Sequence, residues 1–123
     1  MMAAENFQAK DDFGTTQRVK QFTTSDGVIT YTAKTGRAAD DFVIDRVIRV
    51  TTGSTFSLTI TVPDGVYYGQ RLLIIFEVEG GTETIDTSVT TGEEITQLSA
   101  AGSWSELVWL GSTAGWDEFA TGT

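Results

Sequence analysis

The side chains that could do acid–base or metal chemistry in this chain are almost all carboxylates. Its 123 residues include no histidine and no cysteine, which excludes imidazole and thiol catalysis, disulfides, and zinc sites built from those ligands. Acids paired as in glycosidases occur at Asp40-Asp41, with Asp45 nearby, and at Glu93-Glu94. Adjacent acids in a strand point to opposite faces, however, and acids in a loop are usually solvated. We therefore predict no enzyme, no catalytic residues and no cofactor.

Calcium is the one metal that carboxylates and carbonyl oxygens alone could hold. The sequence contains no D-x-[DN]-x-[DN]-G loop. Its two Asp-Gly pairs, Asp26-Gly27 and Asp64-Gly65, are better explained as turns. We therefore predict no metal site.

The net charge of −9 is placed unevenly along the chain. Up to Arg49 the basic and acidic residues cancel, and from Val50 onward Arg71 is the only basic residue among ten acids. An acidic surface repels phosphates, so we expect no nucleic-acid partner. Two readings stay open: the excess acid keeps the protein soluble, or it faces outward while the arginine-bearing half docks on a partner. The longest apolar run is five residues, which predicts neither a secretion signal nor a membrane span.

Aromatic residues offer a binding chemistry that needs no titration. Trp104, Trp109 and Trp116 are expected in the core, because a buried aromatic ring dominates core energetics. Tyr67 and Tyr68 follow a turn and are expected to be exposed. They could contact a glycan by stacking on sugar faces, or anchor a protein interface, where tyrosine is enriched.

The elements that must position these residues are strands, and the clearest pair lies within 55–81. Apolar residues at 56, 58, 60 and 62 alternate with threonine and serine, the pattern of a half-buried strand. Leu72 to Phe76 is continuously apolar, which indicates a strand covered on both faces. A neighbouring copy of the chain could supply the second cover, and so could a closed barrel with an inserted loop.

The remaining strand signals predict an all-β fold. Gln17–Thr23 and Val28–Ala33 flank an Asp-Gly turn and are expected to form a hairpin. Further strands are expected over 42–50, 82–90, 94–98 and 104–110, with Arg46 intruding on the apolar face of the first of these. Eight or nine short strands with frequent turns predict an antiparallel β-sandwich, jelly-roll-like, over 17–123, with no helix in it.

Residues 1–16 are expected to form a short N-terminal arm rather than a strand. They are rich in helix formers, but Phe7 and Phe13 lie six apart and make no helical stripe. Such a segment normally frays unless something holds it. A partner or a sister subunit could hold the arm, or it could lie as a short helix on its own domain.

The order of these features resembles a β-sandwich module of tailed-bacteriophage virion proteins, found in capsid decoration proteins, head fibres and tail-fibre segments. The resemblance covers roughly residues 25–119. The matching pieces are SDGVI at 25–29, LTITVP at 58–63, GQRLLI at 69–74, GGTETI at 80–85 and SWSELVWLGS at 103–112, with Trp116 after them. Because the chain has no repeats, collagen-like stretch or heptads from which a shaft could be built, a decoration protein fits better than a fibre.

This resemblance implies a homotrimer that decorates a capsid as a cement protein, with the major capsid protein and its own copies as partners. The expected location is the virion surface, after assembly in the host cytoplasm. Capsid attachment is expected through the N-terminal region, with candidates Phe7, Lys10, Phe13 and Arg18. Subunit contacts are expected at Leu73, Ile75 and Arg46. The alternatives are a carbohydrate-binding module of a fibre, with Tyr67 and Tyr68 at the glycan, and a tail or baseplate component.

Overall fold

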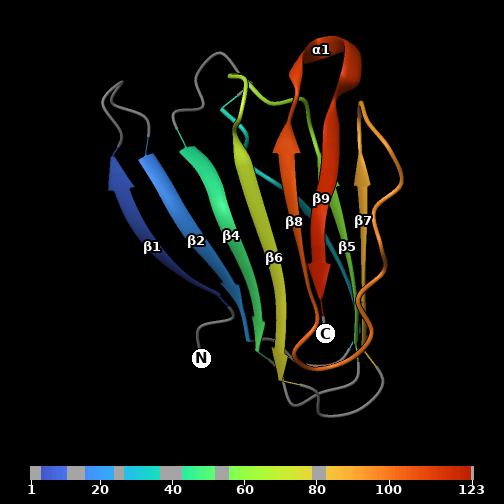
Figure 1. Ribbon diagram of the computed structural model, residues 1–123. Coiled ribbons are helices and arrows are strands. Elements are labelled where there is room, and N and C mark those ends of the chain that lie inside the picture. The colour runs from blue at the N-terminus through green and yellow to red at the C-terminus, as the bar shows by residue number, and fades with distance from the viewer. Residues whose placement is uncertain are drawn as a thin grey trace.

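The computed structural model describes residues 4–10, 16–23, 27–36, 43–51, 56–78 and 83–122 of the chain. Within these ranges lie nine strands and one short helix (Figure 1). The strands are β1 (Ala4–Lys10), β2 (Thr16–Phe22), β3 (Gly27–Thr32), β4 (Val43–Thr51), β5 (Phe56–Val62), β6 (Arg71–Val78), β7 (Glu83–Val89), β8 (Trp104–Trp109) and β9 (Trp116–Gly122). The helix α1 (Gly111–Ala114) turns the chain between β8 and β9.

The strands form two sheets that face each other across one core. The six-stranded sheet has the order β1-β2-β4-β6-β8-β9, and the three-stranded sheet has the order β3-β5-β7. In Figure 1 the six-stranded sheet runs across the front, with β5 and β7 behind β8 and β9. The predicted all-β, two-layer architecture is therefore confirmed.

The prediction of an antiparallel sandwich is wrong for the middle of the chain. From β2 to β7 successive strands alternate between the two sheets, so the chain winds as a flattened coil. After one full turn the chain enters the same sheet again, and the new strand runs parallel to the previous strand of that sheet. The neighbouring pairs β2–β4, β4–β6, β3–β5 and β5–β7 are accordingly all parallel. Antiparallel pairing is confined to β1–β2, β6–β8 and β8–β9.

The predicted hairpin between the second and third strands is also wrong. Both strands form, but β2 pairs with β1 and β4, whereas β3 pairs with β5 in the other sheet. The Asp-Gly signal predicts a turn but does not specify which sheet the next strand enters. Residues 24–26, where that turn is predicted, lie outside the described residues.

Part of the expected N-terminal arm is a strand. Ala4–Lys10 pairs antiparallel with all seven residues of β2 and extends the six-stranded sheet. Its helix formers do not prevent this, because seven ladder positions outweigh a weak local propensity. The rest of the expected arm, 1–3 and 11–15, lies outside the described residues.

Two smaller expectations also fail. Residues 94–98 form no strand, and only Leu98 bridges to Ile85 of β7. This segment instead joins the two sheets along one side, because Leu98 exchanges backbone hydrogen bonds with Ile85 of β7 and Thr96 donates to the carboxylate of Glu118 in β9. The helix α1 was not expected; it has four residues and serves as a turn. In the described ranges, no helix is long and apolar enough to cross a membrane.

The core lies between the sheets, and β5, β6 and β8 contribute alternate residues to it. In β6, Leu72, Ile74 and Phe76 are fully buried, whereas Leu73 and Ile75 on the opposite face are half-buried. The closed barrel is therefore wrong, since the strands form two separate sheets, and cover of the second face by a neighbouring copy stays a prediction. The apolar run marks a strand whose second face is only partly shielded.

Candidate functional site

The outward face of the six-stranded sheet is the candidate functional site. Burial alternates regularly along β8, where Ser105, Leu107 and Trp109 are buried and the residues between them are half-buried. The same alternation holds in β6, so the two strands present matching inward and outward faces. Apart from the exposed Arg71, the side chains on the outward face of β6 and β8 are half-buried.

Apolar side chains cross this face in register. Val19, Val47 and Leu73 lie side by side on three neighbouring strands, and Ile75 aligns with Trp104 in the adjacent row. We call the six half-buried apolar residues of this face the outward stripe. They are Val19, Val47, Leu73, Ile75, Trp104 and Val108. A stripe of this kind on a molecule with a net charge of −9 is the usual mark of an interaction surface.

The end of the outward stripe is fitted to the neighbouring strand. A Cβ added to Gly122 of β9 would lie 2.5 Å from Nε1 of Trp104. The indole ring therefore lies against the backbone of β9 because glycine leaves that space empty.

Charged side chains on the outward face neutralise one another. Arg49 donates two hydrogen bonds to Glu77, with Nε–Oε1 at 3.1 Å and Nη2–Oε2 at 2.6 Å. Arg71 lies 3.7 Å from Glu106, and Arg46 donates to the carbonyl oxygen of Arg71 at 2.8 Å. The excess acid of the molecule therefore lies elsewhere, for example at Asp86, Glu93 and Glu94 around the segment after β7.

A buried cluster between the sheets explains why Arg46 points outward. The pairing of β4 with β2 shifts by one residue after Arg18, so Arg46 is the extra residue of a β-bulge. The bulge turns Asp45 into the core, where its side chain is fully buried. The prediction that Arg46 intrudes on the apolar face is therefore wrong, and Asp45 takes that position.

Asp45 is satisfied from three sides. Arg18 donates Nε–H at 2.5 Å, the Tyr31 hydroxyl donates at 2.5 Å, and the backbone N–H of Lys34 donates at 2.8 Å. Burial and the carboxylate of Asp45 raise the pKa of Tyr31. Burial lowers the pKa of Arg18, but the hydrogen bond and charge of Asp45 more than offset that and raise it overall. The cluster ties β2 and β4 of one sheet to β3 of the other.

An exposed loop lies at the end of the molecule near α1 (Figure 1). Residues 66–68 of this loop are all exposed, and Tyr68 is the most exposed of them at 77%. Tyr67 and Tyr68 thus have the exposure that their place in the sequence predicted. Glycan contact by them stays a prediction.

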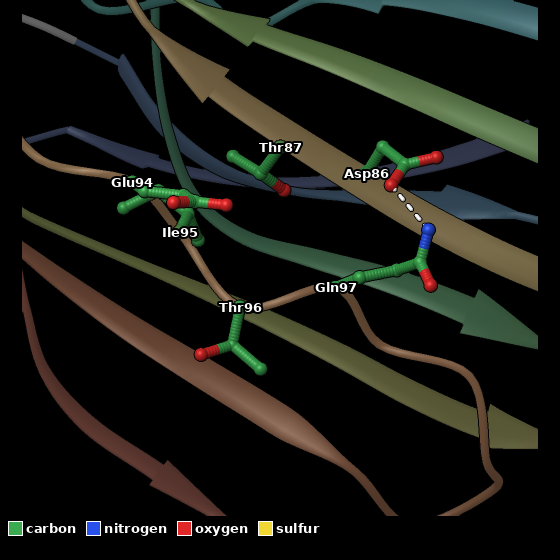
Figure 2. Close-up of a pocket in the computed structure, with 6 residues that line it drawn as sticks. All are labelled: Asp86, Thr87, Glu94, Ile95, Thr96 and Gln97. Carbon is green, nitrogen blue, oxygen red and sulfur yellow. Dashed lines mark hydrogen bonds between the residues drawn. The ribbon is translucent and has the colours of Figure 1, made fainter.

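A concave region lies between β7 and the segment after it (Figure 2). This open hollow of about 600 Å³ is lined by polar side chains apart from Ile95. Across it Gln97 donates to Asp86 at 2.5 Å (Figure 2). Its acids are two, Asp86 and Glu94, and within the described residues no group of three metal-ligating side chains occurs. The hollow has the character of a solvated groove.

The structure separates the predicted site residues into two groups. The subunit-interface candidates Leu73, Ile75 and Arg46 come together on the outward face. Of the attachment candidates, Phe7 and Lys10 lie in β1, and the register pairs Phe7 with Val19. Arg18 is held by Asp45 and Tyr31 with 12% of its side chain exposed. Phe13 lies outside the described residues, and the attachment role stays a prediction.

Sequence reasoning missed Trp104, Val19 and Val47 as members of the outward face. The period-two pattern could have placed Trp104 opposite Leu107 and Trp109, but register across strands cannot be read from one strand. Of the acids weighed for glycosidase chemistry, Asp45 is engaged by Arg18, and Glu93 and Glu94 are exposed. Asp40 and Asp41 lie outside the described residues.

Comparison of the chain with protein-family models, with curated proteins and with solved structures finds no match.

Proposed function

We propose that this chain is a non-enzymatic structural protein of a bacteriophage virion, a homotrimer that decorates and stabilises the capsid. The observation that supports it most is the outward stripe on the six-stranded sheet. Apolar surface that the described residues cover only in part favours association by the hydrophobic effect. The virion and the number three come from the resemblance of the sequence to phage virion modules.

The occupant of the outward face is a second copy of the chain, because charge favours that choice. Copies that each carry a charge of −9 repel one another over most of their surface. On the outward face the ion pairs of Arg49 with Glu77 and of Arg71 with Glu106 remove that repulsion. An apolar centre bordered by paired charges is the usual anatomy of a protein interface.

The test is the mass of the protein in solution by light scattering, with and without capsids of the phage that encodes it. We expect three times the 13.3 kDa of the single chain, and co-sedimentation with capsids. Leu73→Asp should give a folded monomer, since a carboxylate cannot be buried in an apolar contact without a partner. Thr59→Asp places the same charge on the outward face of the other sheet and should leave the trimer intact.

Two results would contradict the proposal in different ways. A wild-type monomer would show that the outward stripe takes no part in self-association. A trimer that does not bind capsids would remove the decoration role while leaving the assembly face in place.

A further inference from the structure

The outward face of the three-stranded sheet is a regular array of side chains. Over the described residues, β3 pairs with β5 and β5 with β7 without a register shift, whereas three pairings of the six-stranded sheet are shifted. The buried Leu58, Ile60 and Ile85 point to the core, so the residues between them point outward. We call the nine outward positions, which form three straight rows across the strands, the hydroxyl face. Its rows are Val28 with Ser57 and Thr84, Thr30 with Thr59 and Asp86, and Thr32 with Thr61 and Ser88.

Hydroxyl side chains occupy seven of the nine positions of the hydroxyl face, and five of these are threonine. A threonine carries a hydroxyl and a methyl group on one branched carbon, and this branching restricts rotation about χ1. Ordering such side chains against a ligand therefore loses little conformational entropy. The hydroxyl face is accordingly largely set in position before a ligand arrives.

The spacing of the hydroxyl face follows from its parallel, in-register ladders. Neighbouring strands lie about 4.8 Å apart, and same-face residues along one strand lie about 6.6 Å apart. Because no described register shift interrupts either ladder, both repeats extend over the whole face. The result is a nearly rectangular net of hydroxyl and methyl groups. Water oxygens on the prism faces of ice also lie on a rectangular net, with two repeats of similar size.

The hydroxyl face carries a single charge, on a molecule whose net charge is −9. That charge is Asp86, and the side-chain amide of Gln97 donates to its carboxylate at 2.5 Å. None of the nine residues is basic. A highly charged macromolecule therefore finds no complementary pattern of charge on this face. The composition favours an uncharged ligand, and ice is an uncharged ligand that also matches the spacing.

The same residues favour ice over a sugar. Sites for small ligands such as sugars are concave and combine aromatic side chains with a few convergent polar groups. The hydroxyl face carries no aromatic residue, and the exposed Tyr67 and Tyr68 lie in a loop outside it. Ice needs no pocket, because repeated contacts over an open face bind it. Methyl groups between the hydroxyls also order the adjacent water, which prepares that layer to join the crystal.

We infer that the hydroxyl face is an ice-binding site, in which threonine and serine hydroxyls take the places of water oxygens at the crystal surface. This inference goes beyond the proposed function and does not depend on capsid binding. The hydroxyl face and the outward stripe lie on the outer surfaces of different sheets. Subunits that associate through the outward stripe therefore still expose the hydroxyl face.

The experiment follows a single ice crystal under the microscope in a solution of the full-length protein. The wild type should open a gap between the melting and freezing temperatures and give the crystal flat facets. Thr59→Tyr changes the central position of the hydroxyl face and should abolish both effects, because the larger ring holds its neighbours away from the ice. Ser112→Tyr is the matched control, since it adds the same ring at an exposed position of α1, outside the face. Circular dichroism and the mass in solution should match the wild type for both variants.

The outcomes separate this inference from the proposed function. A wild-type protein that leaves the crystal round and opens no gap would overturn the inference and leave the decoration role standing. A folded Thr59→Tyr protein that acts on ice like the wild type would also overturn it. If the wild type had no effect on ice but bound crystalline cellulose, and Thr59→Tyr lost that binding, the hydroxyl face would be a polysaccharide surface and the inference would be wrong. A monomer that shapes ice would support the inference while contradicting the proposed trimer.

Discussion

The outward faces of the two sheets cover the same core and differ in their chemistry. On the three-stranded sheet the outward positions are mostly hydroxyl side chains aligned across the strands. They are Thr30, Thr32, Ser57, Thr59, Thr61, Thr84 and Ser88. The six-stranded sheet carries the outward stripe instead. A sheet face that meets water is normally polar, so the apolar face of the six-stranded sheet is the one on which the proposed self-association rests.

The largest effect should come from reversing the polarity of the core itself. Ile74→Asp puts a charge at a fully buried position of β6 and should cost more than about 4 kcal/mol, which prevents folding. Ile75→Asp, one residue along on the outward face, should fold and lose self-association. Circular dichroism and urea unfolding would compare the two. Equal damage from both would show that the two faces of β6 do not differ as described.

Removing one bond of the buried cluster that links the two sheets should have a smaller effect than Ile74→Asp, and this effect should depend on pH. Tyr31→Phe removes one donor to Asp45 and should cost about 1–3 kcal/mol at neutral pH, since the buried carboxylate keeps Arg18 and the N–H of Lys34. The Nζ atom of Lys20 also lies over the Tyr31 ring, 5.4 Å from its centroid.

The sign of the pH dependence follows from the raised pKa of Tyr31. The folded state keeps the phenol proton at a pH where the unfolded chain, with a pKa of about 10, releases it. The stability that Tyr31 contributes is therefore complete below about pH 10 and falls as the pH rises further. We would measure the free energy of unfolding of the wild type and of Tyr31→Phe below and above about pH 10. The two free energies should converge as the pH rises. A gap that stays constant would contradict the raised pKa.

The outward face can be disturbed without adding charge. Gly122→Ala places a methyl group 2.5 Å from Nε1 of Trp104, so the indole must leave the backbone of β9. We expect a loss of about 1 kcal/mol in stability, a shift in tryptophan emission and weaker self-association. Adding Trp104→Phe should recover part of the stability, because the smaller ring leaves room for the methyl group. Unchanged emission in the single variant would show that the ring does not lie on Gly122.

The smallest effect should come from the hydroxyl face. Thr61→Val replaces an exposed hydroxyl with a methyl group of similar size, and the stability should change by less than about 0.5 kcal/mol. The mass in solution should stay that of the wild type. A larger assembly would show that this face also takes part in self-association, which would remove the contrast between the sheets.

The sequence predicts strands well and their partners poorly. The alternation at 56–62 and the apolar run at 72–76 place β5 and β6 correctly, because each pattern reflects burial along one strand. The sheet that each strand joins depends on where its neighbours lie, which the Asp-Gly turn after β2 does not encode. The parallel winding was therefore outside what local patterns could predict.

The residues of the candidate site likewise fall into those that a local pattern predicts and those that it does not. Leu73 and Ile75 could be predicted because an apolar residue on the second face of a strand needs cover. The position of Arg46 could not, because a single-residue bulge reverses every side chain after it and leaves no mark in the composition. The sequence offers Asp45 as a catalytic acid because it lies near Asp40-Asp41, but its bonds to Arg18 and Tyr31 give it a structural role.

The coiled winding also bears on how this protein folds. Arg18 and Asp45, on paired strands, are 27 residues apart, and Arg49 and Glu77 are 28 apart. Among β2 to β7, no strand can pair with its neighbour in the sheet before the chain has made a whole turn of the coil. The entropy cost of loop closure therefore comes before any of these parallel ladders forms. We expect folding that is slow for a chain of this length. On the ribosome, β4 and β6 should wait with unpaired edges until the next turn of the coil emerges.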